Sequence, residues 1–427
     1  MMANTRRDFL RAGAATGLLA ALAGCASSGG SKASGHVVVV GGGYGGATAA
    51  KYLRLWSDGG VQVTLIERKP KLVSCPVSNR VIGGQKALAD ITLGYAQLQS
   101  RWGVQVLQDE AIAVDTAART VQLAAGGVIG YDRLVLSPGI DFLFDRLPGL
   151  AAPAAQDKIL HAWQAGPQTV ALRRQLEAMR DGGTYIIAIP RAPYRCPPAP
   201  YERACLVANY FKQAKPRSKV VILDANDDVQ AKKDLFTKAW SELYPGMIEY
   251  RANSEVRDVH AASKTAVLAS GRLKADVLNV IPPQHAGQIA AQAGLKLVNQ
   301  RWVDVDWLTM ESSSAPGVHV LGDAVFPAPS MIKSGHMANQ QAKLAAAAIL
   351  NLLAGQPPNP EPVLINACYS FVDDRQAIHA TSVHRYNPAT KVIQPVKGAG
   401  GVSAARSEEE GRIAEAWAKN IWADMLT

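Results

Sequence analysis

The sequence predicts an α/β protein with two doubly wound parallel-sheet units and a smaller α+β domain at its C-terminal end. Three observations predict this class. Four valines lead into a glycine-rich turn at 36–46, a second strand-helix-strand pattern occupies 183–224, and a proline-rich break at 355–362 precedes the last segment. A chain of 427 residues is also too long for one compact core, so several domains are expected.

The first unit opens on a strand, a tight turn and a helix. The strand at 36–40 is apolar, and a segment of small residues from Ala47 begins the helix. The turn has the pattern Gly-x-Gly-x-x-Gly, made by Gly41, Gly43 and Gly46. Such a turn holds a pyrophosphate at the helix N-terminus. Glu67, at the end of a second strand over 61–66, suits a ribose hydroxyl, so the turn predicts a Rossmann-like dinucleotide site.

A formal net charge of +10 raises the question of nucleic-acid binding. The Lys and Arg residues are scattered along the chain rather than gathered in runs. Scattered charge is typical of a basic soluble protein, so no nucleic-acid partner is predicted. No metal site is predicted either.

The N-terminal segment predicts export. Residues 5–11 form a twin-arginine signature, and the weakly apolar run to Gly24 is too short to span a bilayer. Residues 22–25 also have the form of a lipobox ending at Cys25, followed by a Ser/Gly-rich tether. The sequence therefore predicts a periplasmic protein without a transmembrane span, and leaves open whether Cys25 carries a lipid anchor or the signal is simply cleaved.

The second unit lacks the glycine turn of the first. A strand at 183–189, a helix at 201–212 and a strand at 219–224 form a complete βαβ unit. Its first loop, 190–200, contains five prolines, a cysteine and no glycine. A stiff loop with missing N–H donors cannot cradle a pyrophosphate, so no NAD(P)H site is expected here.

After this unit the chain returns to the first domain. The strand at 317–321 ends in Gly322-Asp323, the second signature of an FAD site, where the carboxylate accepts a hydrogen bond from the ribityl chain. A helix follows from about His336 to Leu353. Its N-terminus, together with Lys333, would favour negative charge on a reduced flavin ring; an exposed lysine is the alternative for Lys333.

The C-terminal module ends in a helix over about 407–425. Ile413, Trp417 and Ile421 lie on one face at four-residue spacing. The helix carries acidic residues and lacks a basic face, so the stripe favours packing within the protein over contact with a membrane. The predicted division of the chain is a signal and tether (1–35), an FAD-binding domain in two parts (36–165 and 283–355), a central domain (166–282) and a C-terminal domain (356–427).

The cysteines have sharply different surroundings. With Cys25 assigned to the signal, Cys75, Cys196, Cys205 and Cys368 remain. In an oxidising compartment four cysteines allow three complete pairings, and their spacing alone does not choose among these or exclude free thiols.

Several local motifs together resemble the flavoprotein subunit of flavocytochrome c sulfide dehydrogenase. The matching segments cover essentially the whole mature chain and include Ser-Cys-Pro-Val-Ser-Asn, His-Ala-Trp, Arg-Cys-Pro-Pro-Ala-Pro-Tyr-Glu-Arg-Ala, Gly-Asp-Ala and Ala-Cys-Tyr-Ser. The resemblance implies a glutathione-reductase-like fold of the FAD-dependent pyridine nucleotide-disulfide oxidoreductase superfamily, with a small C-terminal interface domain.

The resemblance also implies roles for individual residues. Cys75 matches the residue that forms a thioether to the 8α position of FAD, and Cys196 and Cys368 match a redox-active disulfide beside the flavin. Glu202 matches a carboxylate beside the cysteine that could handle protons; a carboxylate on the helix surface is the alternative. Cys205 has no role in the pattern; it is either a buried thiol or a competitor for Cys196.

The implied activity is sulfide oxidation with FAD as cofactor and a separate c-type cytochrome subunit as electron acceptor, because the sequence contains no Cys-x-x-Cys-His. A thiolate attacks one sulfur of a disulfide and the other sulfur leaves as a thiolate, which is the chemistry that hydrosulfide requires. The alternatives are a quinone-reducing sulfide oxidoreductase, an NAD(P)H-dependent flavin reductase and a non-catalytic flavoprotein partner of a thiosulfate-oxidising system.

Overall fold

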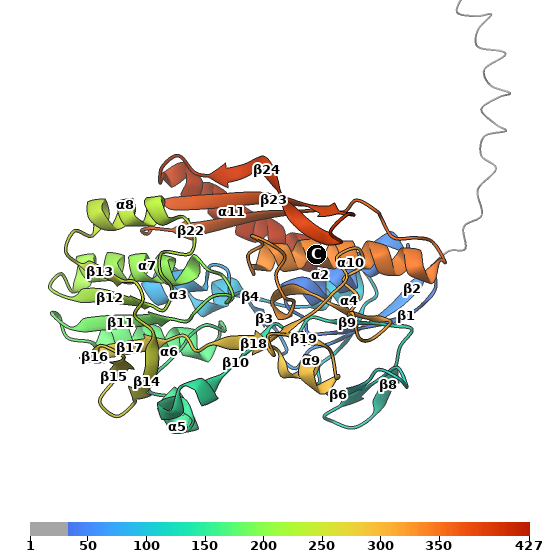
Figure 1. Ribbon diagram of the computed structural model, residues 1–427, viewed down its shortest axis with the longest axis horizontal. Coiled ribbons are helices and arrows are strands. Elements are labelled where there is room, and N and C mark those ends of the chain that lie inside the picture. The colour runs from blue at the N-terminus through green and yellow to red at the C-terminus, as the bar shows by residue number, and fades with distance from the viewer. Residues whose placement is uncertain (1–32) are drawn as a thin grey trace, which may run out of the picture.

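The computed structural model describes residues 33–427 (Figure 1). The twin-arginine segment at 5–11 and Cys25 lie outside the described residues. Export and lipidation therefore remain predictions.

The first large sheet is five-stranded and parallel, with the order β21-β9-β1-β2-β5. Its strands are β1 (Gly35–Val40), β2 (Val61–Ile66), β5 (Gln105–Leu107), β9 (Arg133–Leu136) and β21 (Val318–Val320). The valines of β1 are buried, as expected for a strand covered on both faces. Because β21 joins strands from the start of the chain, the first domain is built from two separate segments.

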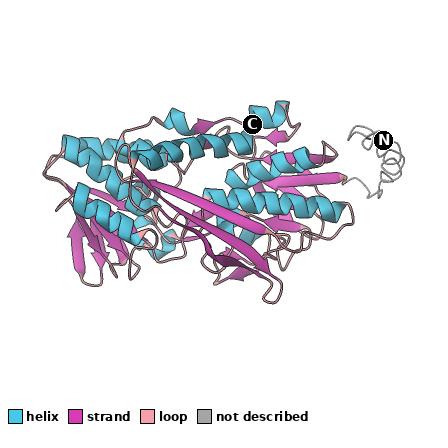
Figure 2. Cartoon of the chain, turned by 90° about the horizontal axis from the view of Figure 1, so that it is seen from above, coloured by secondary structure: helices cyan, strands magenta, loops and turns pink. Residues whose placement is uncertain are grey.

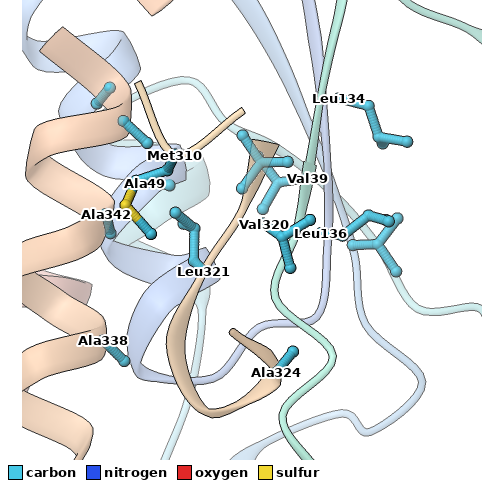
Figure 3. Packing of buried hydrophobic residues seen from close by; sticks show 14 of the residues in the cluster. Val39, Ala49, Leu134, Leu136, Met310, Val320, Leu321, Ala324, Ala338 and Ala342 are labelled. Carbon is cyan, nitrogen blue, oxygen red and sulfur yellow. The ribbon is translucent and has the colours of Figure 1, made fainter. Parts of the chain in front are cut away.

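Two helices pack together against this sheet: α2 (Tyr44–Trp56) and α10 (Gly335–Leu353). Small side chains allow their close approach, and Figure 3 shows Ala338 and Ala342 of α10 on the side that faces Leu321 and the sheet. The helix α2 begins at Tyr44, three residues before the predicted start at Ala47. The glycine turn therefore leads directly into the helix.

The second large sheet is four-stranded and parallel, with the order β13-β12-β11-β17. It lies at the other end of the molecule from the first sheet (Figure 1). Its strands are β11 (Thr184–Ile189), β12 (Lys219–Asp224), β13 (Ile248–Arg251) and β17 (Val277–Val280), and its helices are α6 (Pro167–Ala178), α7 (Ala199–Ala214) and α8 (Lys233–Leu243). The predicted central βαβ unit is present, and the predicted fold class is confirmed.

The C-terminal domain lies over both units. Three long antiparallel strands, β22 (Val363–Phe371), β23 (Ala377–Asn387) and β24 (Val392–Val402), cross the molecule, as Figure 2 shows. The helix α11 (Glu408–Leu426) packs on β22, β23 and α2. This domain therefore joins the two halves of the molecule.

Polar contacts fix α11 to the first domain near its C-terminal end. The Asp424 carboxylate accepts hydrogen bonds from Tyr52 Oη at 2.6 Å and from Asn339 Nδ2 at 2.7 Å, and Lys343 Nζ lies 2.9 Å away. The helix therefore packs within the protein, as predicted. Its apolar stripe is only partly buried, because Ile421 is 6% exposed but Ile413 is 41% exposed.

The remaining elements are short. The small sheets are formed by β3 (Leu72–Val73) with β4 (Thr92–Leu93), β6 (Ala111–Asp115) with β7 (Thr120–Leu123) and β8 (Val128–Gly130), β10 (Ile140–Phe142) with β18 (Gln284–Ala286), β14 (Val256–His260) with β15 (Thr265–Leu268) and β16 (Gly271–Lys274), and β19 (Leu297–Val298) with β20 (Trp302–Val303). The short helices are α3 (Ser78–Gly83), α4 (Ala96–Ser100), α5 (Pro153–Gln156) and α9 (Gln288–Gln292), with 3₁₀ turns η1 (Leu88–Ile91), η2 (Phe144–Arg146), η3 (Pro148–Leu150) and η4 (Gly322–Ala324).

Candidate active site

A cavity of about 560 Å³ lies where the two large units and the C-terminal domain meet. Its volume is in the range of cofactor and substrate sites. Eight of the ten predicted site residues line it: Gly41, Gly43, Glu67, Cys75, Cys196, Glu202, Asp323 and Cys368. Residues distant in the sequence therefore converge on one site, as the predicted active site requires.

The glycine turn forms one end of the cavity. Gly41 has φ +94°, which favours glycine, and its N–H donates to Ile66 O at 2.9 Å. A Cβ on Gly46 would lie 1.8 Å from Gly41 O, so only glycine fits behind the turn. A Cβ on Gly43 would meet no protein atom within 4 Å, which leaves open space in the cavity wall for a ligand.

Glu67 lies beside this turn at the end of β2. Its Oε2 accepts the Gly42 N–H at 2.7 Å, and its Oε1 accepts the Lys69 N–H at 2.9 Å. A carboxylate has lone pairs for about four hydrogen bonds, so Glu67 retains acceptor capacity for a hydroxyl in the cavity.

Cys75 enters the cavity from the loop between β3 and α3. Its Sγ accepts a hydrogen bond from the Ala165 N–H at 3.5 Å. The Arg195 side chain also hydrogen-bonds to Cys75. The sulfur is thus held by two donors and remains half-buried in the cavity wall.

Cys196 and Cys368 both line the cavity. Cys196 lies in the proline-rich loop with φ +55°, and its N–H donates to Lys333 O at 2.8 Å. Cys368 lies within β22, opposite Ala380 of β23. The two side chains are hydrogen-bonded to each other. Both are free thiols in the structure, so the disulfide remains a prediction.

The shared hydrogen bond makes the two thiols unequal. Accepting it lowers the pKa of Cys368 to about 7, an effect that burial opposes. Donating it, together with burial, holds the pKa of Cys196 well above its usual range. Near neutral pH a thiolate of this pair therefore forms on Cys368.

Cys205 lies in a different environment. It is fully buried on α7, and its Sγ accepts a hydrogen bond from Trp240 Nε1 at 3.3 Å. It does not line the cavity. The structure therefore assigns the alternative of a buried thiol to Cys205.

Glu202, in the first turn of α7, is hydrogen-bonded to β22 and to α3. Its Oε1 accepts the Phe371 N–H at 2.9 Å, and its Oε2 accepts Asn79 Nδ2 at 2.7 Å. Burial raises the pKa of Glu202, and these two hydrogen bonds oppose the rise. Glu202 is 7% exposed and lines the cavity, so the alternative of a helix-surface carboxylate is wrong, and its role with protons stays a prediction.

Models of two domains described for this enzyme class match the chain. The model of the central domain of the sulfide dehydrogenase [flavocytochrome c] flavoprotein chain matches residues 169–282, and the flavocytochrome c sulphide dehydrogenase flavin-binding model matches 360–426. The sulfide dehydrogenase flavoprotein chain of Chlorobaculum thiosulfatiphilum is 60% identical over 46 residues, which are 94% of that sequence and 11% of this chain. The chain belongs to this family.

The flavocytochrome c sulfide dehydrogenase flavoproteins share their fold with other FAD-dependent enzymes. A pyridine nucleotide-disulphide oxidoreductase model matches residues 35–177. The mitochondrial sulfide:quinone oxidoreductase of Dictyostelium discoideum is 24% identical over 335 residues, covering 76% of this chain and 72% of the relative. The solved sulfide:quinone oxidoreductase of Aquifex aeolicus superposes with a TM-score of 0.73 at 19% identity, covering 91% of both chains.

The cavity of this family member fits FAD. Asp323 Oδ1 is buried without a hydrogen-bond partner and lines the cavity, so an acceptor is available for a ribityl hydroxyl. The open wall at Gly43 leaves room for a pyrophosphate, and the N-terminus of α10 meets the cavity at Gly335 and His336. Glu67 would hold the ribose and Cys75 would lie at the flavin.

Lys333 was predicted either to act on the flavin through its charge or to be exposed. It is 6% exposed, so the exposed alternative is wrong, and its effect on the flavin stays a prediction. Its Nζ donates to Asp323 O at 2.8 Å and to Val325 O, and it lies 3.8 Å from the centre of the Trp302 ring. It is absent from the wall of the 560 Å³ cavity. Burial lowers the pKa of Lys333 to about 7. Its observed contribution is structural, through the carbonyl that holds Cys196.

In the central domain, the acidic residue at the end of β12 is already engaged. Asp224 Oδ2 accepts Tyr201 Oη at 2.6 Å and Tyr250 Oη at 3.2 Å, and its Oδ1 accepts Asn226 Nδ2 at 2.7 Å. This is the position from which an acidic residue binds the ribose of NAD in related folds. These contacts support the expectation that the central domain does not bind NAD(P)H.

Two charged residues near the cysteines were missed by the sequence analysis. Arg195 hydrogen-bonds to Cys75. The only signal in the sequence for a role of Arg195 is its position next to Cys196 in the motif. Lys232 is buried against Cys368, and no sequence pattern marks it. Among residues 33–427, no group of three or more His, Cys, Asp or Glu side chains is placed to hold a metal ion.

Proposed function

We propose that the protein oxidises sulfide through Cys196 and Cys368 and passes the electrons by way of bound FAD to a separate c-type cytochrome subunit. The observation that supports this most strongly is the hydrogen-bonded pair of thiols in the wall of the cavity that fits FAD. The segments that carry the two thiols are distant in the sequence, and the fold brings them together beside the predicted flavin site.

The sulfur chemistry begins from the Cys196–Cys368 disulfide. Hydrosulfide attacks one sulfur, the S–S bond breaks, and its electron pair leaves on the other sulfur as a thiolate. The attacked cysteine carries the persulfide, in which the substrate sulfur has been oxidised. Glu202, which lines the same cavity, is placed to take up or return the proton of the persulfide.

Bound FAD supplies a two-electron acceptor that can release its electrons singly. The protein contributes Asp323, Glu67 and the glycine turn to orient the cofactor. Flavoproteins of this family pair with a cytochrome subunit, and the sequence has no Cys-x-x-Cys-His for a haem of its own. We also propose that both proteins act in the periplasm, on the basis of the twin-arginine signature predicted at 5–11.

A quinone is the second candidate acceptor, because sulfide:quinone oxidoreductases are among the curated relatives. A quinone-reducing enzyme needs an apolar surface that reaches the membrane. Within residues 33–427 no helix has the length and apolar character required to cross a bilayer. Part of the apolar face of α11 is buried within the protein: Ala414, Ala418 and Ile421 are buried, whereas Ile413 is exposed. We favour the cytochrome because two of the family models that match the chain are those of flavocytochrome c sulfide dehydrogenase.

Sulfide, and not NADH, is expected to reduce the bound flavin. Anaerobic holoprotein is mixed with sulfide or with NADH, and the flavin absorbance is followed. Loss of the oxidised flavin band on adding sulfide supports the proposal. Rapid bleaching by NADH with none by sulfide would contradict it. We expect no reaction with NADH because Asp224 is already hydrogen-bonded and the proline-rich loop contains no glycine.

We propose that the flavin is covalent through Cys75. Acid-denatured wild-type protein is expected to retain yellow colour on the peptide that contains Cys75. Cys75→Ala is expected to bind FAD but to release all of it on denaturation, because the remaining contacts are non-covalent. The measurement is the flavin absorbance of the precipitate and of the supernatant. Release of all flavin from the wild type would show that the thioether is absent.

A further inference from the structure

Lys232 places a buried ammonium group against the strand that carries Cys368. It precedes α8 with φ +55° and is 8% exposed. Its Nζ donates to Cys368 O at 2.8 Å, to Ser370 Oγ at 2.9 Å and to Ile378 O at 3.4 Å. All three hydrogens of the ammonium therefore have acceptors, and the side chain has one defined position between β22 and β23.

The charge of Lys232 has no direct ionic partner. In the described part of the chain, no carboxylate lies within 4 Å of its Nζ. A buried charge without a counter-charge is unfavourable, since neutral acceptors compensate only part of the lost hydration. The titratable groups that act on it come from other elements: Cys368 of β22, Glu202 of α7, Cys196 of the preceding loop and Glu410 of α11.

We propose that Lys232 is a positioning residue whose ammonium stabilises Cys368 as a thiolate, so that Cys368 is the leaving sulfur and Cys196 is the sulfur that hydrosulfide attacks. This inference rests on the proposed function, because it assumes that the two cysteines form the redox-active pair. The inference specifies which cysteine sulfur is attacked and which one leaves, and it names Lys232 as the residue that determines this.

The step balances without a further reactant. Hydrosulfide forms a bond to Cys196 Sγ, the Cys196–Cys368 bond breaks, and the electron pair of that bond goes to Cys368 Sγ. The products are a persulfide on Cys196 and a thiolate on Cys368, so one negative charge enters with the substrate and one remains. The buried ammonium gains its missing counter-charge in this step.

Exposure and electrostatics agree with this direction. Cys196 is half-buried in the cavity wall, whereas Cys368 is 8% exposed. The hydrogen bond from Cys196 and the charge of Lys232 both lower the pKa of Cys368, while burial and Glu202 raise it. Arg195 acts on Cys196, and Arg80 acts on Glu202. Lys232, which hydrogen-bonds to the carbonyl oxygen of Cys368, is thus a cation that lowers the pKa of this thiol.

The test is the pH dependence of Cys368 alkylation in reduced holoprotein. Iodoacetamide is the probe, and mass spectrometry follows the Cys368 peptide. Lys232→Met is expected to raise the midpoint of the rate profile by about one pH unit. Because the thiolate is the reacting form, the rate is expected to fall about fivefold at pH 7 and about tenfold well below the midpoint. The same tenfold change would shift the dithiol–disulfide equilibrium toward the disulfide by about 30 mV.

Two further variants separate charge from structure. Lys232→Arg retains the charge and is expected to restore a midpoint near that of the wild type. Lys233→Met removes the next lysine, whose side chain is 54% exposed and pairs with Asp228 at 2.5 Å, and is expected to leave the midpoint unchanged. An unchanged midpoint in folded Lys232→Met would overturn the inference.

A second experiment uses the wild-type protein, so its result does not depend on whether a variant folds. Oxidised holoprotein receives one equivalent of sulfide under anaerobic conditions, is quenched with an alkylating agent, and the persulfide is located by mass spectrometry. A persulfide on Cys196 supports the inference, and one on Cys368 overturns it while leaving the proposed function in place. Oxidised protein in which the two cysteines are not bridged would instead contradict the proposed function.

Discussion

Replacing Cys368 by serine is expected to abolish flavin reduction by sulfide. A serine hydroxyl cannot form a disulfide with Cys196, so hydrosulfide has no sulfur–sulfur bond to cleave. Loss of a covalent nucleophilic group reduces turnover by about 10³-fold or more. The substitution is nearly isosteric in β22, so we expect the protein to fold and to retain its flavin. Stopped-flow absorbance of the flavin after mixing with sulfide measures the effect.

Matched variants make this result specific. Cys196→Ser is expected to have the same effect, and the double variant no larger effect, because the two residues act as a unit. Cys205→Ala is the control, since Cys205 is buried beside Trp240 and does not line the cavity. It is expected to keep sulfide-dependent reduction. Reduction at the wild-type rate in Cys368→Ser would refute the role of the pair.

Replacing Gly46 by alanine is expected to unfold the FAD site. The added methyl group would lie 1.8 Å from Gly41 O and 3.2 Å from Val39 Cγ1, and a backbone oxygen cannot move aside as a flexible side chain can. The helix α2 would have to move away from β1, with a loss of about 2–4 kcal/mol of stability. We expect purified protein to contain little flavin and to unfold at lower denaturant concentration.

Two other glycines separate folding from cofactor binding. Gly43→Ala places its methyl group in open space at the cavity wall, so we expect normal stability with weakened FAD binding. Gly94→Ala is the neutral control, because Gly94 is exposed and its Cβ would meet nothing within 4 Å. Flavin content and urea unfolding of the three variants are compared. A Gly46→Ala protein with wild-type stability and flavin content would contradict the prediction, because it would show that α2 can move away from β1 without loss of the FAD site.

The main elements could be predicted from the sequence because their signals are local. The strands at 61–66 and 219–224 match the bounds of β2 and β12, since their apolar runs end at charged or turn residues. The glycine turn predicted the dinucleotide fold because Gly41 adopts a positive φ, Gly46 has no room for a Cβ, and Gly43 leaves open space at the cavity wall. The start of α2 was less accurate, because the helix continues into the turn at Tyr44.

The contacts of the site depend on tertiary structure and could be predicted only in part. No spacing rule brings Cys196 to Cys368, and only the resemblance to a known family paired them. The direction of the Lys333 side chain depends on carbonyl groups of the loop at 323–325. Lys232 could not be predicted from the sequence, because its hydrogen-bond partners lie on β22 and β23, far along the chain.

The decisive measurement for the proposed function is electron transfer from sulfide to the acceptor. Anaerobic holoprotein is reduced with sulfide and mixed either with the c-type cytochrome purified with it or with a soluble quinone, and the haem and quinone absorbances are recorded. We expect rapid haem reduction and slow quinone reduction, and we expect both to be lost in Cys368→Ser. Rapid reduction of the quinone with none of the haem would contradict it.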